Sequence, residues 1–293
     1  MPSLERSVGA RPRRSVLYLP GANARAIEKA RTLACDVVIL DLEDSVAPDA
    51  KLAARALAAE AVRAGGFGRR ELVIRTNGLD TPWGIEDLAA AAAAGPDAVL
   101  VPKVSSPQDL AAYRRALGAG PALWAMIETC KAVFALDALA KASGPAGVLC
   151  WVVGTNDLVK EMRCRPLADR APLVPALALS VMAARAHGIT ILDGVYNDIP
   201  DLEGLARECA QGVDLGFDGK SLIHPTHLEI ANRAFSPEPD AVAWARTVAA
   251  AFDLAENAGK GVLKVDGRMV ERLHLDQAKR LIEVAEAIAA QEA

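Results

Sequence analysis

Short apolar segments alternate with helical stretches eight times between residues 15 and 235, and this alternation most constrains the fold. Residues 36–40 are almost wholly apolar, as in a strand that is buried on both faces. Within residues 22–34, Ile27, Ala30 and Leu33 fall on one helical face. Repeated strand-then-helix units form a parallel sheet covered by helices. Eight units without a long break therefore predict an α/β fold, a TIM (β/α)₈ barrel.

The expected strands lie at residues 15–19, 36–40, 71–74, 97–101, 122–127, 148–154, 189–192 and 215–223. An open doubly wound sheet is the other architecture with this alternation. It would need a glycine-rich phosphate turn after the first strand, and Pro20-Gly21-Ala22-Asn23 is not one. We therefore favour the barrel.

Three regions follow from this reading of the chain. Residues 1–14 are expected to be a flexible N-terminal lead-in, residues 15–235 the barrel, and residues 236–293 a C-terminal extension of helices and a hairpin. Asp266-Gly267 marks the hairpin turn. The extension is too small for a full domain, so we expect it to pack on the barrel or on a neighbouring subunit.

Charge and cysteine content narrow the functional class. The net charge of −4 gives no reason to expect nucleic acid or an anionic membrane as a partner, and no apolar stretch is long enough to cross a bilayer. The five cysteines are odd in number, scattered and without a C-x-x-C pair. We expect them to be reduced, in a cytoplasmic protein. The N-terminal residues lack the apolar core of a secretory signal.

Polar residues stand where the apolar strands end, which is where barrel enzymes carry their active sites. Each of these residues alone would be interpreted as part of a turn or as a helix cap. Together they predict a site at this end of the barrel. The set is Asp41, Glu43, Asp44, Arg75, Lys103, Glu128, Asp157 and Asp193. We expect Asp41, Glu43, Asp44, Lys103 and Asp193 to support the site rather than to bind substrate.

Glu128 and Asp157 follow the fifth and sixth strands and should lie side by side. Two neighbouring carboxylates repel each other unless a cation lies between them. An oxygen-only pair favours Mg²⁺ over Zn²⁺, and Mn²⁺ is possible. Such a metal leaves positions for an α-keto acid, and Arg75 could stabilise an enolate oxygen. The pattern suggests carbon–carbon bond chemistry.

The four histidines all lie in the last third of the chain, at positions 187, 224, 227 and 274. A metal-dependent aldolase that acts on free keto acids would be expected to carry a histidine base near the second strand. Asp41-Leu42-Glu43-Asp44 supplies only acids there. That activity is therefore kept as an alternative, and the proton-transfer group must come from elsewhere.

Seven motifs stand in the order of a known family. They are Val16-Leu17-Tyr18-Leu19-Pro20-Gly21, Val38-Ile39-Leu40-Asp41-Leu42-Glu43-Asp44-Ser45-Val46-Ala47, Ile74-Arg75-Thr76-Asn77, Val101-Pro102-Lys103, Ile127-Glu128-Thr129, Gly154-Thr155-Asn156-Asp157-Leu158 and Gly216-Phe217-Asp218-Gly219-Lys220-Ser221-Leu222-Ile223-His224-Pro225. The chain resembles the citrate lyase β subunit-like proteins, in the malyl-CoA and citramalyl-CoA lyase group of the HpcH/HpaI aldolase superfamily. The resemblance covers nearly the whole chain and does not specify the substrate.

The resemblance implies a TIM barrel that holds Mg²⁺ on Glu128 and Asp157, with Arg75 at the substrate's carbonyl or enolate oxygen. It implies a homotrimer or hexamer, and places CoA along Tyr18, Arg25, Lys29, Ile223 and His224. In the family, an aspartate of the tail reaches a neighbouring subunit's active site and transfers the proton. Here Gly267-Arg268-Met269-Val270-Glu271 puts a glutamate at that position.

The expected function is thus a Mg²⁺-dependent lyase that cleaves or forms a β-hydroxyacyl-CoA, such as malyl-CoA or citramalyl-CoA. Its partners would be an acyl-CoA and an α-keto acid, with Arg75 and Glu271 as catalytic residues. One alternative is a β subunit-like component of a citrate lyase-type complex, which would act on an acyl group held by a partner. Another is a binding protein without catalysis, which Arg75, Glu128 and Asp157 argue against.

Overall fold

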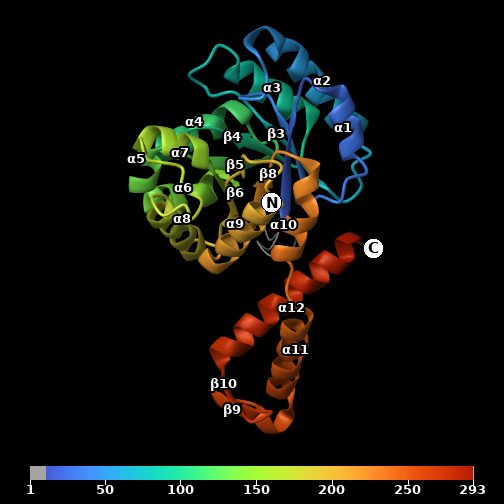
Figure 1. The fold of residues 1–293 in the computed structure, drawn as a ribbon, viewed down its shortest axis with the longest axis vertical. Coiled ribbons are helices and arrows are strands. Elements are labelled where there is room, and N and C mark those ends of the chain that lie inside the picture. The colour runs from blue at the N-terminus through green and yellow to red at the C-terminus, as the bar shows by residue number, and fades with distance from the viewer. Residues whose placement is uncertain (1–10, 293) are drawn as a thin grey trace. The chain divides into compact units, whose positions relative to one another are not determined.

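The computed structural model describes residues 11–292 (Figure 1). Residues 13–235 form one compact unit, and residues 236–292 belong to a second. Eight parallel strands of the first unit close into a barrel in sequence order, with β1 hydrogen-bonded to β8. They are β1 (Ser15–Pro20), β2 (Val37–Asp41), β3 (Glu71–Arg75), β4 (Ala98–Val101), β5 (Ala122–Ile127), β6 (Val148–Val153), β7 (Thr190–Asp193) and β8 (Gly219–Leu222). The predicted (β/α)₈ barrel is confirmed.

The helices of this unit surround the barrel in Figure 1. They are α1 (Ala24–Ala30), α2 (Lys51–Ala64), α3 (Gly84–Ala94), α4 (Pro107–Leu117), α5 (Cys130–Phe134), α6 (Leu136–Ala146), α7 (Thr155–Met162), α8 (Val174–Ala186), α9 (Leu202–Leu215) and α10 (Leu228–Ala234), with 3₁₀ turns η1 (Pro48–Ala50) and η2 (Pro225–His227). Helix α7 continues from the end of β6 through Met162. Helix α9 likewise runs to Leu215, so the last strand starts later than expected.

Side chains alternate between two cores because successive strand residues point to opposite faces. Val16, Ile39, Val73, Trp124 and Val152 fill the interior of the barrel. Their neighbours along the strands, among them Leu17, Val38 and Leu40, face the helices and join the larger cluster between the sheet and the helices. The same alternation decides which strand-end side chains point into the barrel mouth.

The N-terminal end of the barrel is closed by Arg13. Its guanidinium donates to both carboxylate oxygens of Glu71 at 2.6 and 2.9 Å, reaches Thr190 Oγ1 at 3.2 Å, and stacks over the ring of Trp124. Arg14 pairs with the buried Asp36 through its backbone and its side chain. The expectation of a flexible lead-in over residues 1–14 is therefore wrong for Arg13 and Arg14. Residues 1–10 lie outside the described residues.

The second unit contains α11 (Pro239–Asp253), the 3₁₀ turn η3 (Ala255–Asn257), the antiparallel strands β9 (Val262–Val265) and β10 (Arg268–Glu271), and α12 (Arg272–Glu292). The hairpin turn falls at Asp266-Gly267 as predicted, and both residues have a positive φ. Leu263, Val265 and Val270 pack on the two helices in a small core of their own. Within residues 11–292, no helix combines the length and hydrophobicity that a membrane crossing requires.

Candidate active site

A cavity of about 310 Å³ opens at the C-terminal ends of the barrel strands. Its wall comes from the ends of β1, β2, β3, β5 and β6 and from the loops after β7 and β8. Seven of the residues predicted from the sequence line it together: Tyr18, Asp41, Asp44, Arg75, Glu128, Asp157 and Ile223. Five of the eight residues predicted at the strand ends thus line one cavity, and Glu43, Lys103 and Asp193 are not among its described lining residues.

Arg75 is held in the cavity wall by acidic neighbours. Its Nε and Nη2 donate to the two carboxylate oxygens of Asp41 at 2.6 and 2.7 Å, and its guanidinium lies over the ring of Tyr18. Asp41 also accepts the backbone N–H groups of Glu43 and Ser45. Burial would raise the pKa of Asp41, but Arg75 and these hydrogen bonds outweigh it and hold the pKa below its usual value. The pair is therefore ionised.

Glu43 lies behind this pair and is nearly buried. Its Oε2 is 2.7 Å from Arg75 Nη1, although the contact lacks the geometry of a hydrogen bond, and its Oε1 is 3.9 Å from Lys103 Nζ. Burial raises the pKa of Glu43 to about 7, and Arg75 lowers it less than burial raises it. Glu43 and Lys103 are not among the described residues that line the cavity. Their expected supporting role stays a prediction.

Glu128 is 1% exposed at the end of β5 and faces the cavity. Its Oε1 accepts the backbone N–H of Lys103 at 2.7 Å, and Lys103 adopts a positive φ. On the other side lies Gly154, where an added Cβ would come within 2.5 Å of the Glu128 side chain. Burial raises the pKa of Glu128 to about 8, and the charges of Glu43 and Asp157 raise it further.

Asp157 lies in the first turn of α7 and lines the same cavity. The wall contains carboxylate, hydroxyl and amide oxygens but neither histidine nor cysteine. Between residues 11 and 292, no group of three His, Cys, Asp or Glu side chains is placed to hold a metal ion. A pair of repelling carboxylates in an oxygen-lined cavity fits Mg²⁺, which commonly takes one or two carboxylates and completes its shell with water and substrate.

Asp193 corrects the sequence prediction. It ends β7, but Leu192 points into the barrel, so Asp193 points outward to the helix layer. Arg170 donates to it at 2.7 and 2.9 Å, and the fully buried Lys220 donates to Asp193, Glu208 and the carbonyl of Gly194. Asp193 therefore belongs to a buried charge cluster beside α9. The alternation of side chains along β7 was the sequence signal for this orientation.

Sequence reasoning missed Lys51, the first residue of α2. Its Nζ is buried and donates to the carbonyls of Leu42 and Glu43, both at 2.7 Å, and to Asn77 Oδ1 at 2.8 Å. Asn77 in turn donates to Leu42 and to Asp87. This network fixes the loop that carries Asp41 and Asp44 into the cavity wall. Nothing in the helical pattern of α2 indicated these partners.

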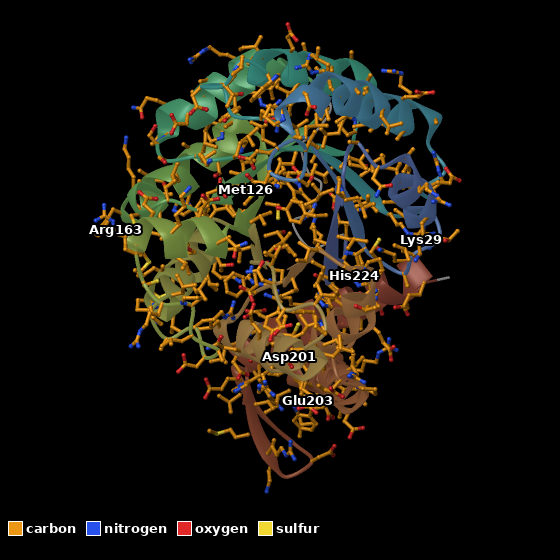
Figure 2. The ribbon with its side chains drawn as sticks, turned by 45° about the horizontal axis from the view of Figure 1, so that its top comes forward. Lys29, Met126, Arg163, Asp201, Glu203 and His224 are labelled. Atoms are coloured by element: carbon orange, nitrogen blue, oxygen red, sulfur yellow. The ribbon has the colours of Figure 1, made fainter. Side chains whose placement is uncertain are left out.

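Only some of the residues predicted to bind CoA line the cavity. Tyr18 and Ile223 line the cavity, whereas Arg25 and Lys29 are exposed on α1 and lie outside its wall. Figure 2 shows Lys29 on the same side of the barrel as His224, which is half-buried and bonded to Thr226 Oγ1 at 2.7 Å. Met126, also labelled in Figure 2, lines the cavity, and its sulfur accepts from the Tyr18 hydroxyl at 3.5 Å.

Glu271 ends β10 in the second unit and is half-buried. Its backbone N–H donates to His274 Nδ1 at 2.9 Å. It shares the outward face of the hairpin with Met269, because Val270 between them points into the core of that unit. Every described residue that lines the cavity belongs to the first unit. The catalytic role of Glu271 stays a prediction.

The fold and the strand-end cavity define a TIM barrel with an acidic mouth. Residues 14–225 match the profile of the HpcH/HpaI aldolase/citrate lyase family. The chain belongs to this family of lyases, as the sequence motifs implied.

Individual proteins agree with this assignment. The chain is 50% identical over 281 residues to the (3S)-malyl-CoA thioesterase of Cereibacter sphaeroides strain KD131, covering 96% of this chain and 97% of that protein. It is 34% identical over 310 residues to the L-malyl-CoA/beta-methylmalyl-CoA lyase of C. sphaeroides strain ATCC 17029, covering 96% and 97%. The crystal structure of CitE from Mycobacterium tuberculosis with magnesium, acetoacetate and coenzyme A is 28% identical, with a TM-score of 0.76 over 95% of this chain and 99% of that one.

Proposed function

We propose that this protein is a Mg²⁺-dependent carbon–carbon lyase that acts on a malyl-type β-hydroxyacyl-CoA and releases an acyl-CoA and an α-keto acid. The observation that carries the proposal is that Glu128, Asp157 and Arg75 line one cavity at the barrel mouth. Glu128 and Asp157 would hold the metal. A relative that acts on malyl-CoA and a structural neighbour that contains magnesium and coenzyme A support it.

Cleavage of the carbon–carbon bond requires stabilisation of an enolate, polarisation of the oxygen that becomes the keto group, and proton transfer. The bond between the hydroxyl-bearing carbon and the thioester α-carbon breaks, and its electron pair moves onto the thioester as an enolate. Arg75 is buried in the cavity wall and held by Asp41, so its guanidinium is suited to stabilise that negative charge. A bound Mg²⁺ would polarise the oxygen that becomes the keto group. The hydroxyl proton must leave, and the enolate carbon must gain one.

Glu271 is the residue we propose for the proton transfer, supplied by a neighbouring subunit of a homotrimer or hexamer. It lies on the outward face of the hairpin beside the exposed Met269. Arg25 and Lys29, four residues apart on α1, are proposed to meet the CoA phosphates, with Tyr18, Ile223 and His224 along its path. We also propose that the protein works in the cytoplasm.

Hydrolysis of the same thioester is the second candidate, and a specific observation favours it. A relative with 50% identity over nearly the whole chain is named as a (3S)-malyl-CoA thioesterase. The glutamate at position 271 replaces the aspartate that the resemblance implies. The longer side chain would carry its carboxylate to a different position, and a misplacement of about 1 Å can lower the rate of a reaction strongly.

Product analysis tests both candidates. Purified protein is incubated with malyl-CoA and MgCl₂, and the products are separated by liquid chromatography and identified by mass. Glyoxylate with acetyl-CoA supports the lyase, and malate with free CoA supports the thioesterase. Glu128→Gln serves as the control that should release neither pair. From citramalyl-CoA, the corresponding products are pyruvate with acetyl-CoA, or citramalate with free CoA. If the wild-type protein converts neither thioester in either way, the proposal is wrong.

A further inference from the structure

Helix α8 is apolar on the side that faces solvent as well as on the side that faces the barrel. Four of its residues are exposed, and all four are apolar: Pro175, Leu179, Met182 and Ala186. Leu179 is 48% exposed and Met182 is 60% exposed. A surface helix normally directs charged or polar side chains to solvent, whereas a helix that is apolar all round is a buried one. The composition of α8 is therefore that of a covered helix.

The two polar side chains of α8 do not change this pattern. Ser180 is buried, and its hydroxyl donates to the carbonyl of Ala176 at 2.8 Å. Arg185 donates to the two carboxylate oxygens of Asp218 at 2.7 and 2.9 Å, and to the carbonyl of Gly216. Both polar groups thus have partners within the barrel unit, and neither belongs to the four exposed positions.

The apolar surface continues onto the neighbouring helix α5. Phe134 ends α5, which packs beside α8, and its 92% exposure is the largest of any bulky apolar side chain in the described residues. We call the surface made by Phe134, Pro175, Leu179, Met182 and Ala186 the α8 face. Contiguous exposed apolar surface marks an interaction site, whereas single exposed apolar residues are common and need no partner.

Charged pairs lie on the helices at either side of α8, which Figure 1 shows between α6 and α9. Lys141 pairs with Asp137 on α6 at 2.6 Å, and Arg207 lies 3.9 Å from Glu203 on α9. An apolar centre within a polar rim is the usual anatomy of a protein–protein interface. The α8 face is thus suited to a protein partner.

A second copy of the same face fits this surface by charge and by area. No charged residue belongs to the α8 face, so two copies can meet without bringing like charges together. At roughly 100 Å² for each large side chain and about 200 Å² for Phe134, the face exposes on the order of 500 Å² of apolar surface. Two such faces would bury about 1,000 Å² in total, which is the lower limit of a specific interface.

We propose that the α8 face is a two-fold interface between two copies of this chain. A two-fold axis through the face sets the two α8 helices antiparallel, so that their opposed dipoles lie side by side. Leu179 and Met182 lie on either side of the midpoint of α8, so Leu179 of one copy meets Met182 of the partner subunit. The proposal involves no residue of the cavity, and it is therefore independent of the proposed function.

Sedimentation equilibrium of the full chain tests the proposal through the mass of the assembly. We expect the wild-type protein to contain an even number of subunits. Met182→Glu buries a charge in the interface and should halve the mass, and Leu179→Lys should do the same. Both positions are exposed, so the variants should keep the wild-type circular dichroism and Tm. Leu52→Glu is the matched control, since it places the same charge at a 63% exposed leucine of α2 and should keep the wild-type mass.

Mixing the two singly substituted proteins tests the antiparallel pairing. The opposite charges introduced at positions 179 and 182 meet across the proposed interface, so an equal mixture of Met182→Glu and Leu179→Lys should regain the wild-type mass. A mixture that stays dissociated would overturn the pairing. An unchanged mass in Met182→Glu, or an odd number of subunits in the wild-type protein, would overturn the interface. A monomeric wild-type protein would also overturn it, and would leave the face to the protein's own second unit or to a different protein.

Discussion

The guanidinium of Arg75 donates one hydrogen bond to each carboxylate oxygen of Asp41, at 2.6 and 2.7 Å, across the edge shared by β2 and β3. The two residues are register partners at the last hydrogen-bonded position of their strands. A bidentate pair in this place fixes the plane of the guanidinium relative to the cavity. The same contact thus holds the barrel mouth together and aims a positive charge into the site.

Loss of Arg75 should therefore cost both stability and activity. Arg75→Ala leaves Asp41 charged and buried without its partner, and we expect a loss of about 3 kcal/mol in the free energy of unfolding, measured with urea. Arg75→Lys keeps the charge but not the bidentate geometry, and should lower kcat by at least about 100-fold. Arg207→Ala, at an exposed arginine of α9, should change stability by less than about 0.5 kcal/mol. Equal stability of Arg75→Ala and Arg207→Ala would contradict this account.

The contact between Gly154 and Glu128 gives a prediction about the metal pair. A methyl group at position 154 would overlap the Glu128 side chain, so Gly154→Ala should push this carboxylate away from Asp157. We expect Mg²⁺ affinity, measured by calorimetry, to fall by about 10- to 100-fold. Gly144→Ala is the matched control, since an added Cβ there meets nothing within 4 Å in α6. Retained affinity in Gly154→Ala would show that Glu128 is not a ligand.

Mg²⁺ should stabilise the folded protein through Glu128. At about 100 times its dissociation constant, a ligand adds about 2.7 kcal/mol, so MgCl₂ should raise the Tm of the wild-type protein. Glu128→Gln should abolish this rise. Asp137→Asn removes an exposed carboxylate of α6 and should leave it intact. NaCl at equal ionic strength separates specific binding from screening. If MgCl₂ raises the Tm of Glu128→Gln as much as that of the wild-type protein, the metal does not bind through Glu128.

The buried cluster around Asp193 predicts a dependence of stability on pH. Burial would raise the pKa of Asp193, but Lys220 and Arg170 outweigh it and lower the pKa below the usual value. A depressed pKa contributes stability that is present above the unfolded value near about 3.9 and is lost as pH falls further. Asp193→Asn should therefore be strongly destabilised at pH 7, and the difference from wild type in urea unfolding should shrink below about pH 4. A difference that stays constant with pH would contradict this.

Subunit mixing tests the proposed role of Glu271. Glu271→Gln and Glu128→Gln should each be inactive alone. If the extension serves a neighbouring subunit, random oligomers of the two variants contain intact pairs of barrel and extension at about a quarter of their sites, and activity should return to that level. Glu271→Asp is the conservative variant and should keep measurable activity. No recovery after denaturation and joint refolding would count against a shared site, provided that each variant refolds alone.

The alternation of short apolar segments and helical stretches predicted the fold. A strand that is buried on both faces needs a continuous apolar run, and few other structures require one. The strand-end rule likewise predicted Asp41, Arg75, Glu128 and Asp157 as wall residues, since topology alone places them together. The rule failed for Asp193, which ends a strand as predicted but directs its side chain outward to the helix layer and not into the cavity. Lys51 and Arg13 were missed because their partners are distant in sequence, and no local pattern encodes such contacts. The roles of Arg25, Lys29 and Glu271 stay predictions.

The closure of the barrel between its first and last strands also constrains how the molecule can be made. Ser15 is a register partner of Lys220, and Arg13 reaches Glu71 and Thr190. During synthesis β1 emerges first, yet one of its edges has no partner until β8 has been made. Contacts so distant in sequence form slowly, and an unpaired strand edge is prone to misassembly. The newly made N-terminal half is thus the vulnerable intermediate, and completion of β8 is the event that ends its exposure.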